Sequence, residues 1–151
     1  EIDPLIFDKI MEVNVKAPWS LSNLVLPHLK TNKKGSIINI ASVEALTPGA
    51  GLGIYSTSKA AMLMLSKTQA KEWGKFGVRV NAICPGLIQT KFSAALWQNE
   101  KIVQKIQKAI PSGRMGQPEE MIGLACLLAA DAGAYMTGGV YTADGGYMIA
   151  G

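Results

Sequence analysis

The apolar run Ser-Ile-Ile-Asn-Ile-Ala at residues 36–41 predicts a short β-strand. It lacks a regular polar–apolar alternation, which is typical of a parallel strand buried on both faces. A loop rich in Gly, Pro and Ala follows at residues 47–53. A helix is expected next, over about residues 55–75, with Gly77 as its stop. A buried strand followed by a long helix is the first part of a right-handed βαβ crossover.

The region before this strand predicts a helix over residues 4–29, because apolar side chains recur there at helical spacing. Asp3 is its expected N-cap, and Pro4 suits the first helical position. Pro18 has no N–H to donate and is expected to kink this helix or split it in two.

The region after Gly77 predicts two more strands, at residues 78–83 and 140–143. Helical segments are expected between them, at about 92–110 and from Gln117 to about Ala130. The chain therefore predicts an α/β fold, a partial Rossmann-like (doubly wound) parallel sheet of about three strands flanked by helices. One edge of the first strand would have no strand of this chain beside it.

Composition and charge narrow the classes of function. The chain has 151 residues, 48% of them hydrophobic, and a net charge of +4, which fits one globular domain. Its densest basic run, Lys30 to Lys34, lacks an aromatic or arginine platform, so we expect a solvated loop and no nucleic acid. No apolar run reaches the roughly 18 residues of a membrane span, so no membrane is expected either.

The sulfur and imidazole groups give no metal site. Cys84 and Cys126 lie in apolar stretches without metal-ligand spacing, so both are expected to be buried free thiols in a reducing, cytoplasmic setting. His28 has no partner cluster.

Tyr55 and Lys59 are the strongest chemical candidates. Lying four residues apart, they project from one face of the expected helix. An ammonium nearby would lower the pKa of a tyrosine, which could then exchange a proton with an alkoxide. A YxxxK pair taken alone is more often an ordinary surface pair.

Three further features bear on whether this pair belongs to an active site, and each also has a simpler structural interpretation. Ser42 ends the first strand, where open α/β sheets bind ligands, although a lone serine there is commonly a turn cap. Asn14 stands inside an otherwise apolar helix, although such residues often face water. The turn from Pro85 to Thr90 could hold a flat carboxamide, or it is a plain turn.

Asn14, Ser42, Tyr55 and Lys59, in this order and with Tyr55 thirteen positions after Ser42, resemble the catalytic tetrad of the short-chain dehydrogenase/reductase family. Further motifs that agree are Asn14-Val15, Ile38-Asn39-Ile40-Ala41-Ser42, Tyr55-Ser56-Thr57-Ser58-Lys59-Ala60-Ala61, Val78-Arg79-Val80-Asn81, Pro85-Gly86, Tyr135-Met136-Thr137-Gly138 and Asp144-Gly145-Gly146. The resemblance covers essentially the whole chain.

The resemblance implies an oxidoreductase that transfers hydride between NAD or NADP and a small carbonyl or alcohol substrate. Tyr55 would be the general acid/base, Lys59 would lower its pKa and bind the nicotinamide ribose, and Ser42 would position the substrate oxygen. Asn14 would anchor a water that links Lys59 to solvent.

The cofactor turn follows from the same resemblance. Pro85, Gly86, Ile88 and Thr90 would hold the carboxamide, and residues 92–110 would form a substrate lid.

The same resemblance implies that residues 1–151 are the C-terminal part of one NAD(P)-binding domain of roughly 250 residues. The chain starts at Glu1, and no glycine-rich phosphate turn such as G-x-G-x-x-G occurs in it. Two hypotheses remain open: an enzyme whose cofactor half is supplied elsewhere, and a truncated, non-catalytic remnant that only self-associates. Under both, a homo-oligomer is expected through the helices at 4–29 and 55–75.

Overall fold

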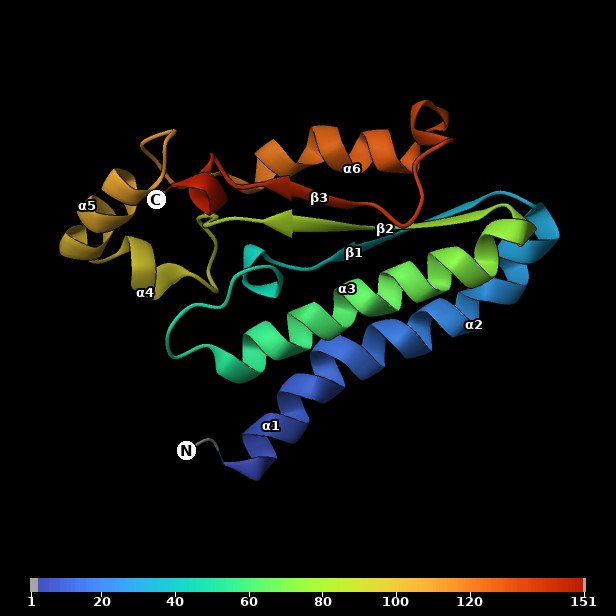
Figure 1. Ribbon diagram of the computed structural model, residues 1–151, viewed down its shortest axis with the longest axis horizontal. Helices are drawn as coiled ribbons and strands as arrows, with labels where there is room; N and C mark the ends of the chain where they lie inside the picture. Colours follow the sequence, from blue (N-terminus) through green and yellow to red (C-terminus); the bar gives the residue numbers. More distant parts are fainter. Residues whose placement is uncertain (1–2, 151) are drawn as a thin grey trace.

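The structure is a computed structural model that describes residues 3–150 (Figure 1). The helices and strands are α1 (Pro4–Met11), η1 (Glu12–Lys16), α2 (Ala17–Asn32), β1 (Gly35–Ile40), η2 (Val43–Ala45), α3 (Gly53–Trp73), η3 (Gly74–Phe76), β2 (Val78–Pro85), α4 (Ala94–Trp97), α5 (Glu100–Ala109), η4 (Pro118–Met121), α6 (Ile122–Ala129), η5 (Asp131–Gly133), β3 (Val140–Ala143) and η6 (Tyr147–Ile149). Helices α1, α2 and α3 lie on one face of the sheet and α6 lies on the other, while α4 and α5 lie beyond the ends to which the strands point.

The sheet has three parallel strands in the order β1-β2-β3, which confirms the predicted α/β class. β1 pairs with β2 from Gly35↔Val78 to Ile40↔Ile83, and β2 pairs with β3 from Ala82 onward. β2 is the central strand, and nearly all of its residues are buried, because helices cover both faces of the sheet at this strand. β1 has a partner on one side only, within the described residues, and Ile40 is 52% exposed. The burial predicted for residues 36–41 is therefore incomplete.

The expected helix at residues 4–29 is divided into three pieces. Asp3 accepts a hydrogen bond from the Leu5 N–H at 2.9 Å and caps α1. A π-turn follows, in which the Ala17 N–H donates to the carbonyl of Glu12, five residues earlier. Pro18 then lies in the first turn of α2, so the predicted split at this proline is confirmed. Helix α2 runs through Pro27 to Asn32, three residues beyond the expected end.

The core joins α3 to the central strand. One cluster contains Met62 and Leu63 against Ala82 and Cys84, and a second contains Trp73 with neighbours on the other half of β2. The packing of α3 against β2 therefore fixes the candidates on its first turns relative to the strand ends.

The two cysteines have different environments. Cys84 is buried, as predicted, but Cys126 is exposed, so the prediction for Cys126 was wrong. Its helix α6 is apolar on all sides, and therefore the sequence does not show which side faces the sheet. Only Leu128 of this helix is buried, while Ile122 and Leu127 are exposed as well.

None of the helices in residues 3–150 combines the length and hydropathy that a bilayer crossing requires.

Candidate active site

Ser42 lies directly after β1 and begins the short turn η2. Its side-chain oxygen accepts a hydrogen bond from the Glu44 N–H at 3.1 Å. The serine is therefore a turn cap, as the simpler interpretation expected. It is also 9% exposed, and its hydroxyl lowers the pKa of Tyr55 in part, so its predicted role beside the tyrosine stays a prediction.

Tyr55 and Lys59 lie on the first turns of α3, which starts at the carboxyl end of the strands (Figure 1). The Lys59 Nζ lies 5.7 Å from the centroid of the Tyr55 ring, which confirms that the two side chains share a face. The same Nζ donates a hydrogen bond of 3.0 Å to the carbonyl of Ile40 at the end of β1. This bond fixes the ammonium between α3 and the strand.

The electrostatics of this pair differ from the sequence-based expectation. Burial raises the pKa of Tyr55, interaction with the Ser42 hydroxyl lowers it in part, and the Glu44 carboxylate raises it further. Burial also lowers the pKa of Lys59. The prediction that Lys59 lowers the pKa of Tyr55 is not met here, because the loss of hydration outweighs the other effects and the ammonium is directed at Ile40.

Asn14 lies in the π-turn η1 and reaches α3. Its side-chain amide donates to the Ser58 hydroxyl at 3.0 Å, and Ser58 donates in turn to the backbone carbonyl of Tyr55 at 2.7 Å. The Asn14 side chain therefore joins η1 to the first turns of α3, which carry Tyr55. The backbone carbonyl of Asn14 loses its usual donor four residues later, because that residue is Pro18.

The turn from Pro85 to Thr90 leaves the carboxyl end of β2 and folds back on itself. The Gly86 N–H donates to the Ala143 carbonyl at 3.0 Å, and a Cβ at Gly86 would lie 2.7 Å from the Cα of Asp144. Only glycine therefore fits between β2 and the end of β3. The hydroxyl of Thr90 lies 3.2 Å from the Ser93 Oγ, and the Ser93 Oγ–H donates to the Ile88 carbonyl.

The family model described as enoyl-(acyl carrier protein) reductase matches residues 1–148. The chain belongs to the short-chain dehydrogenase/reductase family. It is 37% identical over 141 residues to dehydrogenase/reductase SDR family member 4 of Oryctolagus cuniculus, covering 93% of this chain and 54% of that protein. It is 36% identical over 143 residues to the 3-oxoacyl-(acyl-carrier-protein) reductase FabG of Thermotoga maritima, covering 95% of this chain and 57% of the reductase.

Solved structures of the family have the same fold. A gluconate 5-dehydrogenase from Burkholderia cenocepacia, in complex with NADP and tartrate, superposes with a TM-score of 0.97 at 29% identity, over 99% of this chain and 59% of that one. A gluconate 5-dehydrogenase described as putative, from Beutenbergia cavernae, gives a TM-score of 0.95 at 35% identity, over 99% and 60% of the two chains. The chain spans about half the length of the curated relatives it matches.

The segment expected as a substrate lid in this short-chain dehydrogenase/reductase forms two helices, α4 and α5. Phe92, just before α4, is 87% exposed, and its ring centroid lies 6.4 Å from that of Tyr55. Trp97 donates its indole N–H to the Thr90 carbonyl at 2.9 Å. This segment is thus bonded to the predicted cofactor turn and presents an apolar ring beside Tyr55.

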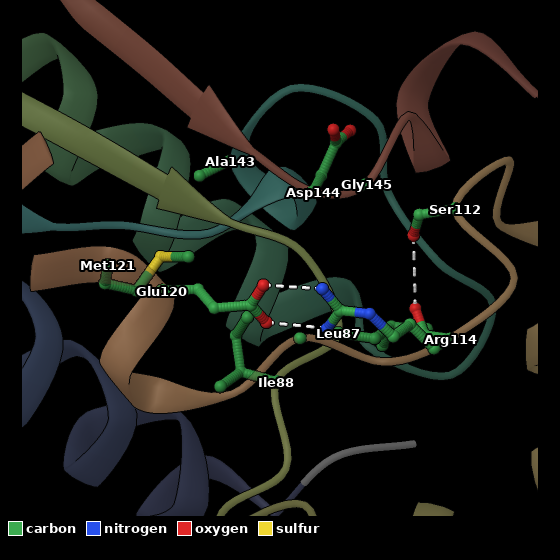
Figure 2. Close-up of a pocket in the computed structure, with 10 residues that line it drawn as sticks. Leu87, Ile88, Ser112, Arg114, Glu120, Met121, Ala143, Asp144 and Gly145 are labelled. Carbon is green, nitrogen blue, oxygen red and sulfur yellow. Dashed lines mark hydrogen bonds and ion pairs between the residues drawn. The ribbon is translucent and has the colours of Figure 1, made fainter. Parts of the chain in front are cut away.

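A cavity of about 190 Å³ lies on another side of that turn (Figure 2). Leu87 and Ile88 line it together with Asp144, but Ser42, Tyr55 and Lys59 do not. Across it, Arg114 and Glu120 form a two-point ion pair, with contacts of 2.6 and 2.7 Å. Both charged groups are therefore paired with each other. The cavity shares Ile88 with the predicted cofactor turn, but Ser42, Tyr55 and Lys59 lie outside it.

Glu44 is the residue that sequence reasoning missed. Its carboxylate accepts hydrogen bonds from the Gly49 N–H at 2.6 Å and from the Ser56 hydroxyl at 2.8 Å. A signal for it existed, because Glu44 is the only charged residue in the 24 positions between Lys34 and Lys59.

Proposed function

We propose that this chain carries the catalytic residues of an NAD(P)-dependent oxidoreductase that interconverts a carbonyl and an alcohol on a small molecule, as one part of a single Rossmann-like domain. The observation that carries the proposal is a placement at the carboxyl end of the parallel strands, where this class of fold binds ligands. Ser42 directly follows β1 there, and Tyr55 and Lys59 share a face of the first turns of α3. The NADP named with the Burkholderia cenocepacia gluconate 5-dehydrogenase supports the choice of cofactor class.

The groups present fit the nicotinamide end of such a cofactor. Lys59 gives one of its three N–H donors to Ile40, among the described residues, so two others can reach a ribose diol. The turn of Pro85, Gly86, Ile88 and Thr90 lies at the same end of the sheet and offers backbone groups for a carboxamide. These residues account for the nicotinamide and ribose only, and the diphosphate needs other groups.

The chain's own part in the reaction is proton transfer and orientation. When bound, the nicotinamide supplies the hydride that forms the new C–H bond. Ser42 orients the carbonyl oxygen, and Tyr55 gives that oxygen its phenolic proton, so that an alcohol and a phenolate result. The phenolate then takes a proton back from solvent, while the Lys59 ammonium lies 5.7 Å from the centroid of its ring. The backbone carbonyl of Asn14, which lacks the donor that Pro18 cannot supply, holds water on that route.

Cofactor binding is tested by titrating the chain with NADH and NADPH and following nicotinamide fluorescence. We expect saturable binding that Lys59→Met weakens at least about tenfold, because its hydrogen bonds to the ribose are charge-assisted. Lys67→Met, an exposed lysine on the same helix, is the matched control. Absence of binding at millimolar cofactor, or equal binding by both variants, would contradict the proposal and favour a chain that only self-associates.

Catalysis is tested by Tyr55→Phe in an active preparation. We expect the rate of carbonyl reduction to fall at least about 10²-fold, because the general acid is lost while the ring is kept. Tyr135→Phe is the matched control, since Tyr135 is fully exposed and lies far along the chain. A Tyr55→Phe rate equal to that of the control would refute the assignment.

We also propose that two copies of the chain associate through α1, α2 and α3. Leu5, Leu21, Leu24 and Met64 are between 62% and 76% exposed on these helices. A groove of about 520 Å³ lies between the same helices, and Trp19 is one of the residues that line it. Apolar surface of this kind is typical of a contact between subunits. A monomer measured by size-exclusion chromatography with light scattering would contradict this.

The cytoplasm is the proposed compartment, because Cys84 and Cys126 are both free thiols and a reducing environment keeps them so.

A further inference from the structure

Glu44 connects the two ends of the segment that separates Ser42 from Tyr55. At one end, its backbone N–H donates to the Ser42 side-chain oxygen at 3.1 Å. At the other end, its carboxylate accepts from the hydroxyl of Ser56, which is 5% exposed and directly follows Tyr55. A single residue thus contacts both the serine and the turn of α3 that carries the tyrosine.

The loop between these ends is fitted to this carboxylate. The Gly49 N–H donates to the Glu44 Oε2 at 2.6 Å. A Cβ on Gly49 would lie 2.8 Å from Oε1 of the same carboxylate, which real Cβ atoms do not tolerate. Gly49 therefore has no side chain at the point where the carboxylate closes the loop, and any larger residue would push it away.

The N-terminus of α3 lacks a side-chain cap of its own, which the Glu44 carboxylate can partly replace. Leu52 is the N-cap residue and offers no side-chain hydrogen bond, and the first turn contains no acidic residue. A carboxylate near a helix N-terminus is favourable because it interacts with the exposed N–H groups and the helix dipole. Glu44 places its negative charge beside this turn from another part of the chain.

We propose that Glu44 is a positioning residue, which binds the loop at Gly49 and the first turns of α3 at Ser56 and so fixes the Tyr55 hydroxyl against Ser42. The proposal deepens the proposed function, on which it rests, and Glu44 itself takes no part in proton transfer. Lys59 and Glu44 are the charged groups near Tyr55, and the Cys84 thiol lies on the strand side.

The test measures the coupling between Ser42 and Tyr55 without any cofactor. The four tyrosines are replaced by 3-fluorotyrosine, and the Tyr55 phenol is titrated by fluorine NMR, with Tyr55→Phe identifying its signal. In the otherwise unchanged chain, Ser42→Ala is expected to raise the apparent pKa of Tyr55, because the Ser42 hydroxyl lowers that pKa in the unchanged chain.

Two substitutions at Glu44 then separate position from charge. Glu44→Gln keeps an oxygen that can accept both hydrogen bonds, so the Ser42→Ala effect is expected to persist while the starting pKa of Tyr55 falls. Glu44→Ala removes both bonds, so the Ser42→Ala effect is expected to disappear. Glu72→Gln, at an exposed site near the far end of α3, is the matched control and should change neither quantity.

An undiminished Ser42→Ala effect in Glu44→Ala overturns the proposal. If Glu44→Ala does not fold, Gly49→Ala replaces it, because the added Cβ displaces the same carboxylate. An undiminished effect in Gly49→Ala overturns the proposal equally. Because the measurement contains no nicotinamide, its outcome is independent of the cofactor titration that tests the proposed function.

Discussion

Burial and hydrogen bonding act in opposite directions on Tyr55, and burial has the larger effect on its pKa. The free chain therefore keeps this phenol protonated at neutral pH, which is the form that the proposed general acid requires. Because the folded chain holds this proton more tightly than the unfolded chain, stability is lost only as the pH rises through the raised pKa of Tyr55.

The pKa of Glu120 shifts in the opposite direction to that of Tyr55. Its hydrogen bonds to Arg114 and to the Gln117 N–H lower its pKa from 4.5 to about 2. The resulting stability is present above the ordinary pKa of a glutamate and is lost as the pH falls through about 2. We expect the difference in Tm between the wild-type chain and Glu120→Gln to shrink between about pH 5 and pH 2, because acid neutralises the carboxylate in the wild-type chain alone.

Thermal unfolding followed by circular dichroism over this pH range measures that difference. The ion pair is exposed, so a small effect at neutral pH is expected. Glu119→Gln, next to Glu120 and outside the ion pair, is the control. A difference in Tm that is independent of pH would contradict the assignment.

At the scale of the elements, α3 contains an unsatisfied amide. Gln69 is 3% exposed, and neither its Nε2 nor its Oε1 has a hydrogen-bond partner among residues 3–150. We expect Gln69→Leu to raise the free energy of unfolding by about 1–3 kcal/mol, because it removes the cost of burying unpaired polar atoms. Denaturant unfolding measures this, with the exposed Gln107→Leu as control. A loss of stability would mean that the amide has a partner after all.

Gly77 joins η3 to β2 and has a left-handed φ of 75°. A Cβ there would collide with the backbone carbonyl of Lys33, beside the start of β1. Gly51 has a similar φ of 80° but nothing within 4 Å of a Cβ. We expect Gly51→Ala to cost about 1–2 kcal/mol of stability from the backbone alone, and Gly77→Ala about 3 kcal/mol or more. Equal costs of the two substitutions in denaturant unfolding would show that the backbone around Gly77 and Lys33 adjusts to the added Cβ at little cost.

The elements were largely predictable because local chemistry determines them. Asp3 with Pro4, the alternation of buried runs with helical spacing, and Gly77 each mark a boundary that the structure keeps. The π-turn at Glu12–Lys16 was not predictable beyond the break at Pro18, because its hydrogen-bond register depends on packing against α3. The prediction that Cys126 is buried failed for a similar reason, because the sequence of a helix that is apolar on all sides does not show which side faces the sheet.

At the scale of the whole molecule, β1 has an open edge within the described residues. The amide of Gly35 donates to the carbonyl of Gly77, just before β2, and the amide of Ala41 donates to that of Ile83 within β2. The backbone amides of Ile37 and Asn39 therefore point to β2 as well, and those of the alternate residues point outward. We expect the amides of Ser36, Ile38 and Ile40 to exchange with solvent at least about tenfold faster than those of Ile37 and Asn39. Hydrogen exchange followed by NMR measures this. Equal protection along β1 would mean that another chain covers this edge.

The proximity of the candidate residues was predictable from the sequence, but their geometry was not. Spacing placed Tyr55 and Lys59 on one face, and strand ends placed Ser42 near them. The direction of Lys59 toward Ile40 depends on two elements that are distant in sequence, so no local pattern contains it. The same is true of Glu44, whose partner Ser56 lies across a loop.

The bond from Asn14 through Ser58 to the Tyr55 carbonyl has a consequence for cooperativity. These two bonds connect η1 to the turn of α3 that carries Tyr55, so we expect a shift of η1 to move that turn. In that case a partner bound on α1 and α2 would be thermodynamically linked to a ligand bound beside Tyr55. Linkage is reciprocal: if association of two chains tightens a ligand at Tyr55 by some factor, that ligand tightens the association by the same factor.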